Sequence, residues 1–414
     1  MPITTLGTAD ARLATVTLGG SAGGTTNVRK VFFQVNLGGS QVQNVLGGRV
    51  SLGFDQAVSE AQVECGQDPG GSYNDIVEVY MGAGNNDTLR FRGLLKEKQS
   101  NLYPRSVTLV ARGALSRAEE YVFSFDPSDP IQADIKQKNL QQAGVSGFLV
   151  QQIVGSSSST DGNLVYQVLA TVPDLEVDPG NIDDTGTVVG QAAFNAWAWK
   201  QGQTALNYVQ EVDKVARMRT FESIGGTIYR RRVTGWPAPN GNWEYTFTEA
   251  VDIFSGHSAR TIIGIKNAVL VEGNDYGVGR GAIYAEVKGG NSFQSGFVWE
   301  NFSSPLIERV GAGFPGDVAT GFACADVATD IYAEVNRETV RLTLTTPRDD
   351  VIGPGQTHLV TTPDNQPDRL LTAQPLWVQR VDIEVNSGAF SQTITYIGGG
   401  EATGEPPPIN WAGS

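Results

Sequence analysis

Histidine and cysteine are scarce in this chain of 414 residues, which contains two of each. With only His257 and His358, a zinc site or an acid–base mechanism built from two or three imidazoles is nearly excluded. We expect both histidines to be structural or exposed. Cys65 and Cys324 lie far apart and in no CxxC spacing. We therefore expect buried thiols, without a metal centre or a disulfide framework.

Several kinds of segment are missing as well. No run approaches the roughly 18 apolar residues that cross a bilayer, so no membrane-spanning segment is expected. The opening MPITTLGTADARLA lacks the features of a signal peptide, which predicts synthesis in a reducing cytoplasm. The GxSxG, HExxH, P-loop and EF-hand motifs are absent. The segment GNDYGVGRGA at 273–282 lacks GxGxxG spacing and reads as a turn or bulge.

Charge is sparse and acidic in balance. Asp, Glu, Lys and Arg make up 18% of the residues, and the net charge is −14. Tight binding of nucleic acid needs clustered Lys and Arg, so it is not expected. The negative sign fits either ordinary solubility or a wall along which DNA slides without sticking.

The chain nevertheless has the material of a folded β protein. Hydrophobic residues make up 40% of it, with seven Trp, seventeen Phe and twelve Tyr, which excludes wholesale disorder. Fifty glycines are scattered without a collagen-like period, as expected for many tight turns between strands. A chain of this length exceeds one hydrophobic core, so about three or four domains are expected.

The first block, residues 1–125, is expected to form a small β-barrel or β-sandwich domain. Residues 28–35, 76–80 and 89–95 carry the β-branched and aromatic enrichment of strands. Residues 107–112 alternate imperfectly between inward and outward types. Such a pattern fits a strand that is covered on both faces in places.

Residues 126–250 are expected to form an α/β insertion domain. Asp129 and Pro130 are typical of a helix start, and the helical pattern runs to Gly144. Residues 155–162, GSSSSTDG, read as a flexible surface loop.

The end of this insertion combines a second helix with a hairpin. From Ala205, the run ALNYVQEVDKVAR places apolar side chains at helical spacing, and Thr204 is suited to cap the helix. A Gly-Gly pair at 225–226 then supplies the positive φ angles of a two-residue hairpin loop. In that arrangement, residues 221–224 pair with residues 227–230.

The rest of the chain returns to a β pattern. We expect a β-rich region at 251–322, and then a unit at 323–400 that contains a helix at 323–337 followed by closing strands. Residues 401–414 contain three consecutive prolines. They are expected to form an extended tail that is suited to grip a neighbour.

Clustered charges and tryptophans give no clear active site. Three acidic pairs are adjacent in sequence and thus point different ways on a strand, which favours solvated loop charges over a glycosidase site. These pairs are Glu119 and Glu120, Asp183 and Asp184, and Asp349 and Asp350. The arginine run at 230–232 either binds an acidic partner surface or ends a hairpin in solvent. Trp197 and Trp199 in an apolar helix, and Trp377 in a strand, favour packing over sugar stacking.

Four segments, taken in order, carry a resemblance to a known family. They are RFRGLLKEKQSNLYPRSVTLVARGAL, IQADIKQKNLQQAGV, QTALNYVQEVDKVARMRTFESIGGTIYRRRV and LWVQRVDIEVNSGAFSQTITYIGG. Over residues 12–400, the chain resembles the central hub proteins of bacteriophage tails. This family includes baseplate hub and late-control tail proteins and the N-terminal part of tail-associated siphophage proteins. The resemblance lies in block order and pattern, and no catalytic residue transfers with it.

The resemblance implies a mainly β fold with α/β insertions, in which two hub-type β-barrels per chain build a trimeric ring with pseudo-sixfold symmetry. Such a ring, assembled in the host cytoplasm and carried in the virion, adapts a hexameric tail tube to a threefold tip. Duplex DNA passes through it without specific binding. The implied partners are two further copies, a tail tube or distal tail protein, tip, spike or receptor-binding proteins, and the tape-measure protein. It implies no enzyme, cofactor or metal. A receptor- or polysaccharide-binding tail fibre or an adhesin is the alternative.

Overall fold

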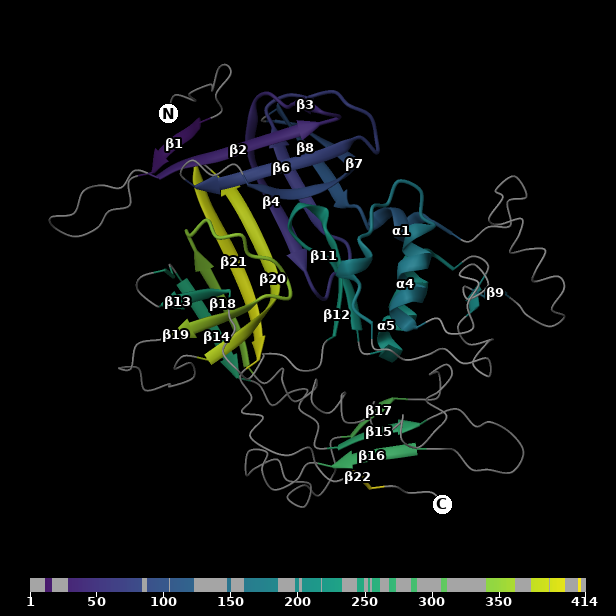
Figure 1. The fold of residues 1–414 in the computed structure, drawn as a ribbon. Coiled ribbons are helices and arrows are strands. Elements are labelled where there is room, and N and C mark those ends of the chain that lie inside the picture. The colour runs from purple at the N-terminus through teal and green to yellow at the C-terminus, as the bar shows by residue number, and fades with distance from the viewer. Residues whose placement is uncertain are drawn as a thin grey trace.

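A computed structural model gives the fold of the chain (Figure 1). It describes residues 12–16, 29–83, 88–103, 105–122, 147–149, 160–184, 198–200, 203–216, 218–232, 244–248, 252–253, 255–260, 268–272, 284–288, 307–310, 340–361, 374–386, 388–398 and 409–410. The described part is mainly β, with a few helices to one side of a large sheet.

That sheet has fourteen strands, eight of them from the first block. These are β1 (Arg12–Val16), β2 (Arg29–Leu37), β3 (Ser40–Gln41), β4 (Val45–Gly53), β5 (Glu60–Cys65), β6 (Ile76–Ala83), β7 (Leu89–Leu102) and β8 (Arg105–Gly113). The others are β13 (Tyr245–Thr248), β14 (Ser255–Arg260), β18 (Val340–Thr346), β19 (Thr357–Thr361), β20 (Gln374–Asn386) and β21 (Ala389–Gly398). The strands predicted at 28–35, 76–80 and 89–95 are confirmed as β2, β6 and β7.

Strands of the first block and strands from residues 374–398 meet within this one sheet. Its main path runs β1-β2-β6-β7-β8-β5-β4-β20-β21-β18-β14. Strand β4 pairs antiparallel with β20, from Gly53 opposite Arg380 to Gly48 opposite Val385. Among the described strands this path is open, so the two-barrel arrangement stays a prediction, while the β blocks are joined edge to edge (Figure 1).

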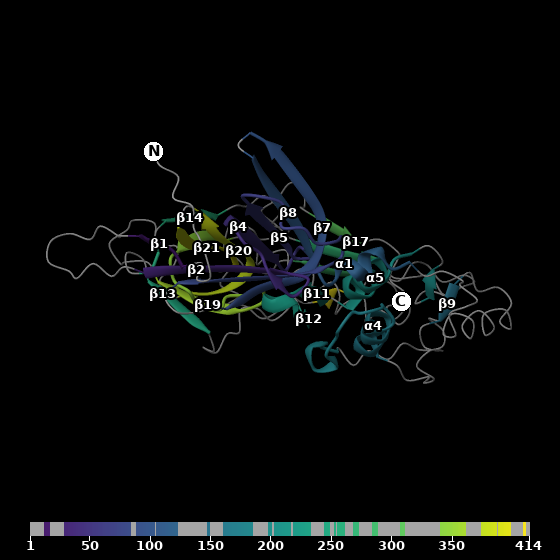
Figure 2. The same ribbon diagram turned by 90° about the horizontal axis from the view of Figure 1, so that it is seen from above.

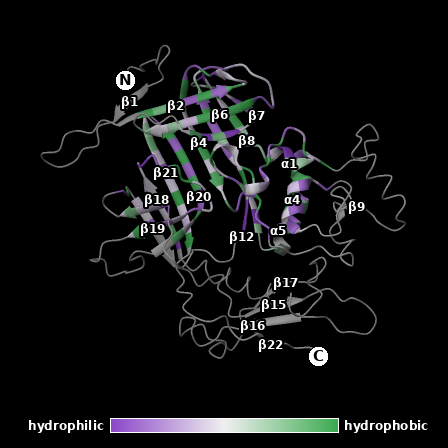
Figure 3. Ribbon diagram, viewed as in Figure 1, coloured by the Kyte–Doolittle hydropathy of each residue, from purple (hydrophilic) through white to green (hydrophobic). Residues whose placement is uncertain are grey.

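A single apolar core lies under both halves of the sheet. In β5, alternate residues Ala61, Val63 and Cys65 are buried, as the two-residue period of a strand requires. Side chains of β20 and β21, such as Ile383 and Ile394, belong to the same cluster. Figure 3 shows hydrophobic residues recurring along these strands. Burying each such side chain contributes about 1.5–3 kcal/mol, so the two β blocks stabilise each other.

The insertion packs helices beside the sheet around a second core. It contains α4 (Asp161–Ala170), the 3₁₀ turn η1 (Pro179–Asn181) and α5 (Ala205–Ala216), and α1 (Ser116–Glu120) at the end of the first block packs with them. The helix predicted from Ala205 is confirmed, and the Thr204 hydroxyl accepts the Asn207 N–H at 3.2 Å as its cap. The loop predicted at 155–162 is wrong at its end, because Gly162 lies in α4. Apolar side chains of α4 and α5 form the shared core.

The hairpin that follows α5 differs from its predicted register. Strands β11 (Met218–Glu222) and β12 (Ile228–Arg232) pair with Glu222 opposite Ile228. Ile224 joins Gly225 and Gly226 in the 3₁₀ turn η3 (Ile224–Gly226), with φ of 73° and 79° at the two glycines. The predicted positive φ angles are present, but a longer loop shifts the pairing by one residue.

The remaining described strands form two small sheets. Strands β9 (Gly147–Leu149) and β10 (Ala198–Lys200) pair, so Trp199 lies in a strand and not in the predicted helix. Strands β15 (Ala268–Glu272), β16 (Tyr284–Lys288), β17 (Ile307–Val310) and β22 (Ile409–Asn410) make a four-stranded sheet. Part of the predicted extended tail thus pairs with β16.

Other predicted features lie outside the described residues. They are the helices at 130–144 and 323–337, the segment at 273–282, Cys324, Trp197 and Trp411. Within the described ranges, no helix has the length and apolar character needed to cross a membrane.

Candidate functional site

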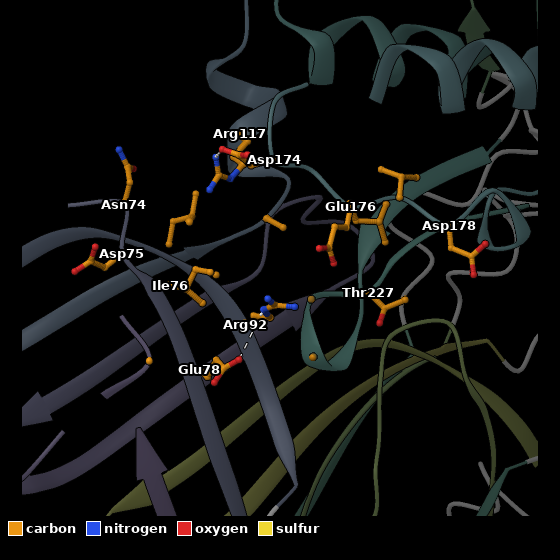
Figure 4. A pocket seen from close by; sticks show the side chains of 18 of the residues that line it. Asn74, Asp75, Ile76, Glu78, Arg92, Arg117, Asp174, Glu176, Asp178 and Thr227 are labelled. Carbon is orange, nitrogen blue, oxygen red and sulfur yellow. Dashed lines mark hydrogen bonds and ion pairs between the residues drawn. The ribbon is translucent and has the colours of Figure 1, made fainter. Parts of the chain in front are cut away.

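A groove lies between the sheet and the insertion (Figure 4). It encloses about 1100 Å³. One wall comes from the β2–β3 turn, from Asn74 and Asp75 before β6, and from β6 and β7, including Glu78 and Arg92. The other comes from the segment after α4 and from the β11–β12 loop.

The charges in this groove are unbalanced toward the acidic side. Its lining contains Asp75, Glu78, Asp174, Glu176 and Asp178 against two arginines. Both arginines are engaged: Arg92 Nε lies 3.8 Å from a Glu78 carboxylate oxygen, and Arg117 Nη1 lies 3.1 Å from Asp174 Oδ2. The groove therefore favours cationic groups and repels phosphates.

Close backbone contact fixes the distance between the two walls. A Cβ added to Gly226 would lie 2.8 Å from the Arg92 carbonyl oxygen, so only glycine allows this approach. Gly226 also has φ of 79°, in the left-handed region that glycine adopts easily. The Gly-Gly pair singled out in the sequence thus seats the hairpin loop against β7.

A second feature is the long hairpin of β7 and β8, which projects from the body of the molecule (Figure 2). Strand β7 continues to Leu102, well past the predicted end at residue 95. At the tip, Leu102 is 89% exposed and Tyr103 is 96% exposed. Two large apolar side chains this far from the core are suited to contact another molecule.

The paired aspartates at 349 and 350 contradict the prediction of solvated charges. Arg90 of β7 is fully buried and forms an ion pair with Asp349, whose side chain is 8% exposed. Arg90 Nη1 also donates to the Asp350 carbonyl oxygen at 2.9 Å. Burial lowers the pKa of Arg90, and Asp349 opposes this shift. A buried guanidinium needs such a partner, and nothing in the local sequence pattern indicates that Arg90 lies inside.

The arginine run at 230–232 was predicted either to bind an acidic partner surface or to end a hairpin in solvent, and the structure shows a different arrangement. Arg230 is buried, with Nε 2.7 Å from Asp213 Oδ1 and Nη1 2.9 Å from Asp161 Oδ2. Burial alone would lower the pKa of Arg230, but the two aspartates raise it. Arg231 pairs with Asp183 at 2.5 Å nearer the surface. This run therefore fastens the hairpin to the insertion, and the Arg232 side chain lies outside the described part.

The histidines agree with their prediction. His257 of β14 is exposed, while His358 of β19 is buried, with Nδ1 2.8 Å from the Tyr396 hydroxyl and Nε2 3.2 Å from Gln356 Oε1. Burial lowers the pKa of His358 to about 3, and Arg348 adds to the shift. A neutral, hydrogen-bonded imidazole of this kind serves packing.

Two further predictions of buried side chains are confirmed. Cys65 is a buried free thiol, and burial raises its pKa to about 12. Trp377 is 3% exposed and packs edge-on against Phe54, with 4.1 Å between ring centroids. Among the residues that the structure describes, no group of three His, Cys, Asp or Glu side chains is placed to hold a metal ion.

Two solved structures share this arrangement. The tail protein from Neisseria meningitidis MC58 superposes with a TM-score of 0.60 at 9% identity, over 89% of this chain and 96% of that one. The 43 kDa tail protein of prophage MuSo2 from Shewanella oneidensis gives a TM-score of 0.57 at 8% identity, over 88% and 98%. This chain has the phage tail-protein fold. No family model and no curated protein matches the sequence.

The tail-protein fold confirms the resemblance that the block order predicted. Because both superpositions extend over nearly the whole of each chain, they include the sheet and the insertion together. At such low identity the likeness concerns the fold, and individual residues of the groove and the hairpin must be judged by their own chemistry.

Proposed function

We propose that this protein is a structural component of a bacteriophage tail tip or baseplate, a homotrimeric hub ring that joins a hexameric tail tube to a threefold tip. The observation that carries the proposal is the β4–β20 junction, which sets an N-terminal and a C-terminal β block side by side in one chain. Three such chains present six β units around an axis. Closed symmetry of this kind bridges a sixfold and a threefold partner.

We propose that duplex DNA passes through this ring without specific binding. The net charge of −14 supports a weakly adhesive channel, because like charge opposes close approach of phosphates. Such a role requires no catalysis, in keeping with one exposed and one buried histidine. We place the protein in the virion, after assembly in the host cytoplasm.

The projecting hairpin is our candidate for contact with neighbouring tail proteins. Leu102 and Tyr103 at its tip are almost fully exposed, and aromatic side chains are enriched at protein interfaces. The partners that we propose are a tail tube or distal tail protein on one side, tip, spike or receptor-binding proteins on the other, and the tape-measure protein.

The mass of the purified protein in solution tests the trimer. The account predicts a particle of three times the 44.2 kDa chain mass in native mass spectrometry. A population that stays monomeric at micromolar concentration, alone and with its adjoining tail proteins, would contradict it.

A further inference from the structure

A buried carboxylate lies where the chain passes from the sheet into the insertion. Glu222, at the end of β11, is 1% exposed. The chain leaves β8 at Gly113 and enters α1 at Ser116, and Glu222 packs against this exit. A Cβ added to Gly113 would lie 1.7 Å from Glu222 Oε2, so the carboxylate occupies the space beside that glycine.

Three hydrogen bonds join Glu222 to two segments outside its own hairpin. Oε2 accepts the Ser59 N–H at 2.7 Å and also the Ser59 hydroxyl. Oε1 accepts the Leu115 N–H. Glu222 thus connects β11, the residue before β5 and the residue before α1. We call Glu222, Ser59 and Leu115 the exit cluster.

The direct donors in the exit cluster are all uncharged. Among the charged residues on the segments around it, Arg112 of β8 pairs with Glu119 of α1 at 2.6 Å, and Glu60 of β5 accepts a hydrogen bond from Gln62 at 2.7 Å. On β12, Arg230 is held by the insertion aspartates. Burial raises the pKa of Glu222 to about 7, although its hydrogen bonds and Arg112 act in the opposite direction.

We propose that Glu222 is a proton-linked latch, which holds the insertion to the sheet most firmly when its carboxyl group is protonated. In the neutral form, Oε2 donates its proton to the Ser59 hydroxyl, which accepts as readily as it donates. Oε1 still accepts the Leu115 N–H. The hydrogen bonds are kept and no net charge is buried. Ionisation instead leaves a carboxylate inside, where none of the described cationic side chains is in contact with it.

The direction of the pH effect follows from the two protonation states. When the exit cluster opens, Glu222 meets water and returns to its ordinary pKa of 4.5, against about 7 when closed. Between these values, opening releases a proton, so opening becomes easier as pH rises. The latch is most stable below pH 4.5, and its extra stability is lost as pH rises to about 7. The opening equilibrium changes by on the order of a hundredfold across that window.

Hydrogen exchange of the full-length protein tests this latch. After correction for the intrinsic rate at each pH, protection of the Ser59 and Leu115 amides should fall on the order of a hundredfold between pH 5 and 8 and then level off. Protection that is flat with pH, or that rises, would overturn the proposal. This experiment needs no variant.

Variants separate Glu222 from other titrating groups. Glu222→Gln should abolish the pH dependence of these two amides, because an amide group cannot ionise. Glu120→Gln, at a carboxyl group of α1 with 57% side-chain exposure that pairs with Lys96, is the matched control and should leave the profile unchanged. A pH profile that survives Glu222→Gln or shifts with Glu120→Gln would also overturn it.

Discussion

Arg230 of β12 and Asp213 of α5 form an ion pair that is removed from water, with 2.7 Å between Nε and Oδ1 and side chains that are 0% and 3% exposed. Asp161 of α4 supplies a second carboxylate to the same guanidinium. One side chain therefore joins the β11–β12 hairpin to both large helices of the insertion.

Arg230→Ala should destabilise the protein by about 3–5 kcal/mol, because it leaves two buried carboxylates without their cation. Chemical denaturation measures this loss. Arg231→Ala is the matched control: its pair with Asp183 has side chains 28% and 46% exposed, and should contribute no more than about 1 kcal/mol. Equal losses for the two variants would show that the buried ion pairs of Arg230 contribute no more to the free energy of unfolding than the exposed pair of Arg231.

His358 should make the fold sensitive to acid. Its folded pKa of about 3 lies below its ordinary value of 6.5, so its stabilising contribution is complete above pH 6.5 and is lost as pH falls toward 3. Between pH 7.5 and 4.5, wild type should lose about 2–3 kcal/mol relative to His358→Gln in urea denaturation.

Glu222 changes the free energy of unfolding with pH in the opposite direction. Because it is present in both wild type and His358→Gln, its contribution cancels when the two proteins are compared at the same pH. His257→Gln, at an exposed histidine, should follow wild type over this range. If wild type and His358→Gln lose stability in parallel, the buried imidazole is not the source of the acid sensitivity.

The hairpin tip should matter for assembly and little for folding. The double variant Leu102→Ser with Tyr103→Ser changes side chains that are 89% and 96% exposed, so its stability should stay within about 0.5 kcal/mol of wild type. Incorporation into tails, measured by complementation or pull-down with adjoining tail proteins, should fall at least tenfold. Val351→Ser, at a side chain 42% exposed outside the hairpin, is the control. Normal incorporation of the double variant would rule the tip out as a contact.

The β4–β20 junction should make the two β blocks unfold together. Ile383 of β20 is fully buried and lies opposite Val50 of β4. Ile383→Ala should cost about 2–5 kcal/mol. Trp377 and Phe33 lie in different blocks. When amide hydrogen exchange around each residue is followed against denaturant concentration, both regions should unfold at the same, lowered midpoint concentration. Separate midpoints would mean that the blocks are independent.

Local pattern predicted much of this fold, and long-range packing accounts for what it missed. The helix from Ala205 and strand β2, predicted at residues 28–35, show patterns that a sequence reveals directly. Asp349 looked like a surface charge because its partner Arg90 lies far away along the chain. Asp213 lies near Arg230 in sequence, but the burial of this pair depends on how α4 and α5 pack against the hairpin. Glu222 offered no such signal, because it lies between Phe221 and Ser223 at the end of a strand. Whether a charge is buried depends on which segments cover it, and a single sequence does not show that.

Electron microscopy of the purified protein tests the central claim most directly. Three chains, each contributing its N-terminal and C-terminal β blocks side by side, should appear as a threefold ring with six similar units around a channel wide enough for duplex DNA. The channel wall should be acidic or weakly charged. A compact particle without a channel, or a ring whose channel is lined mainly by Lys and Arg, would contradict the account.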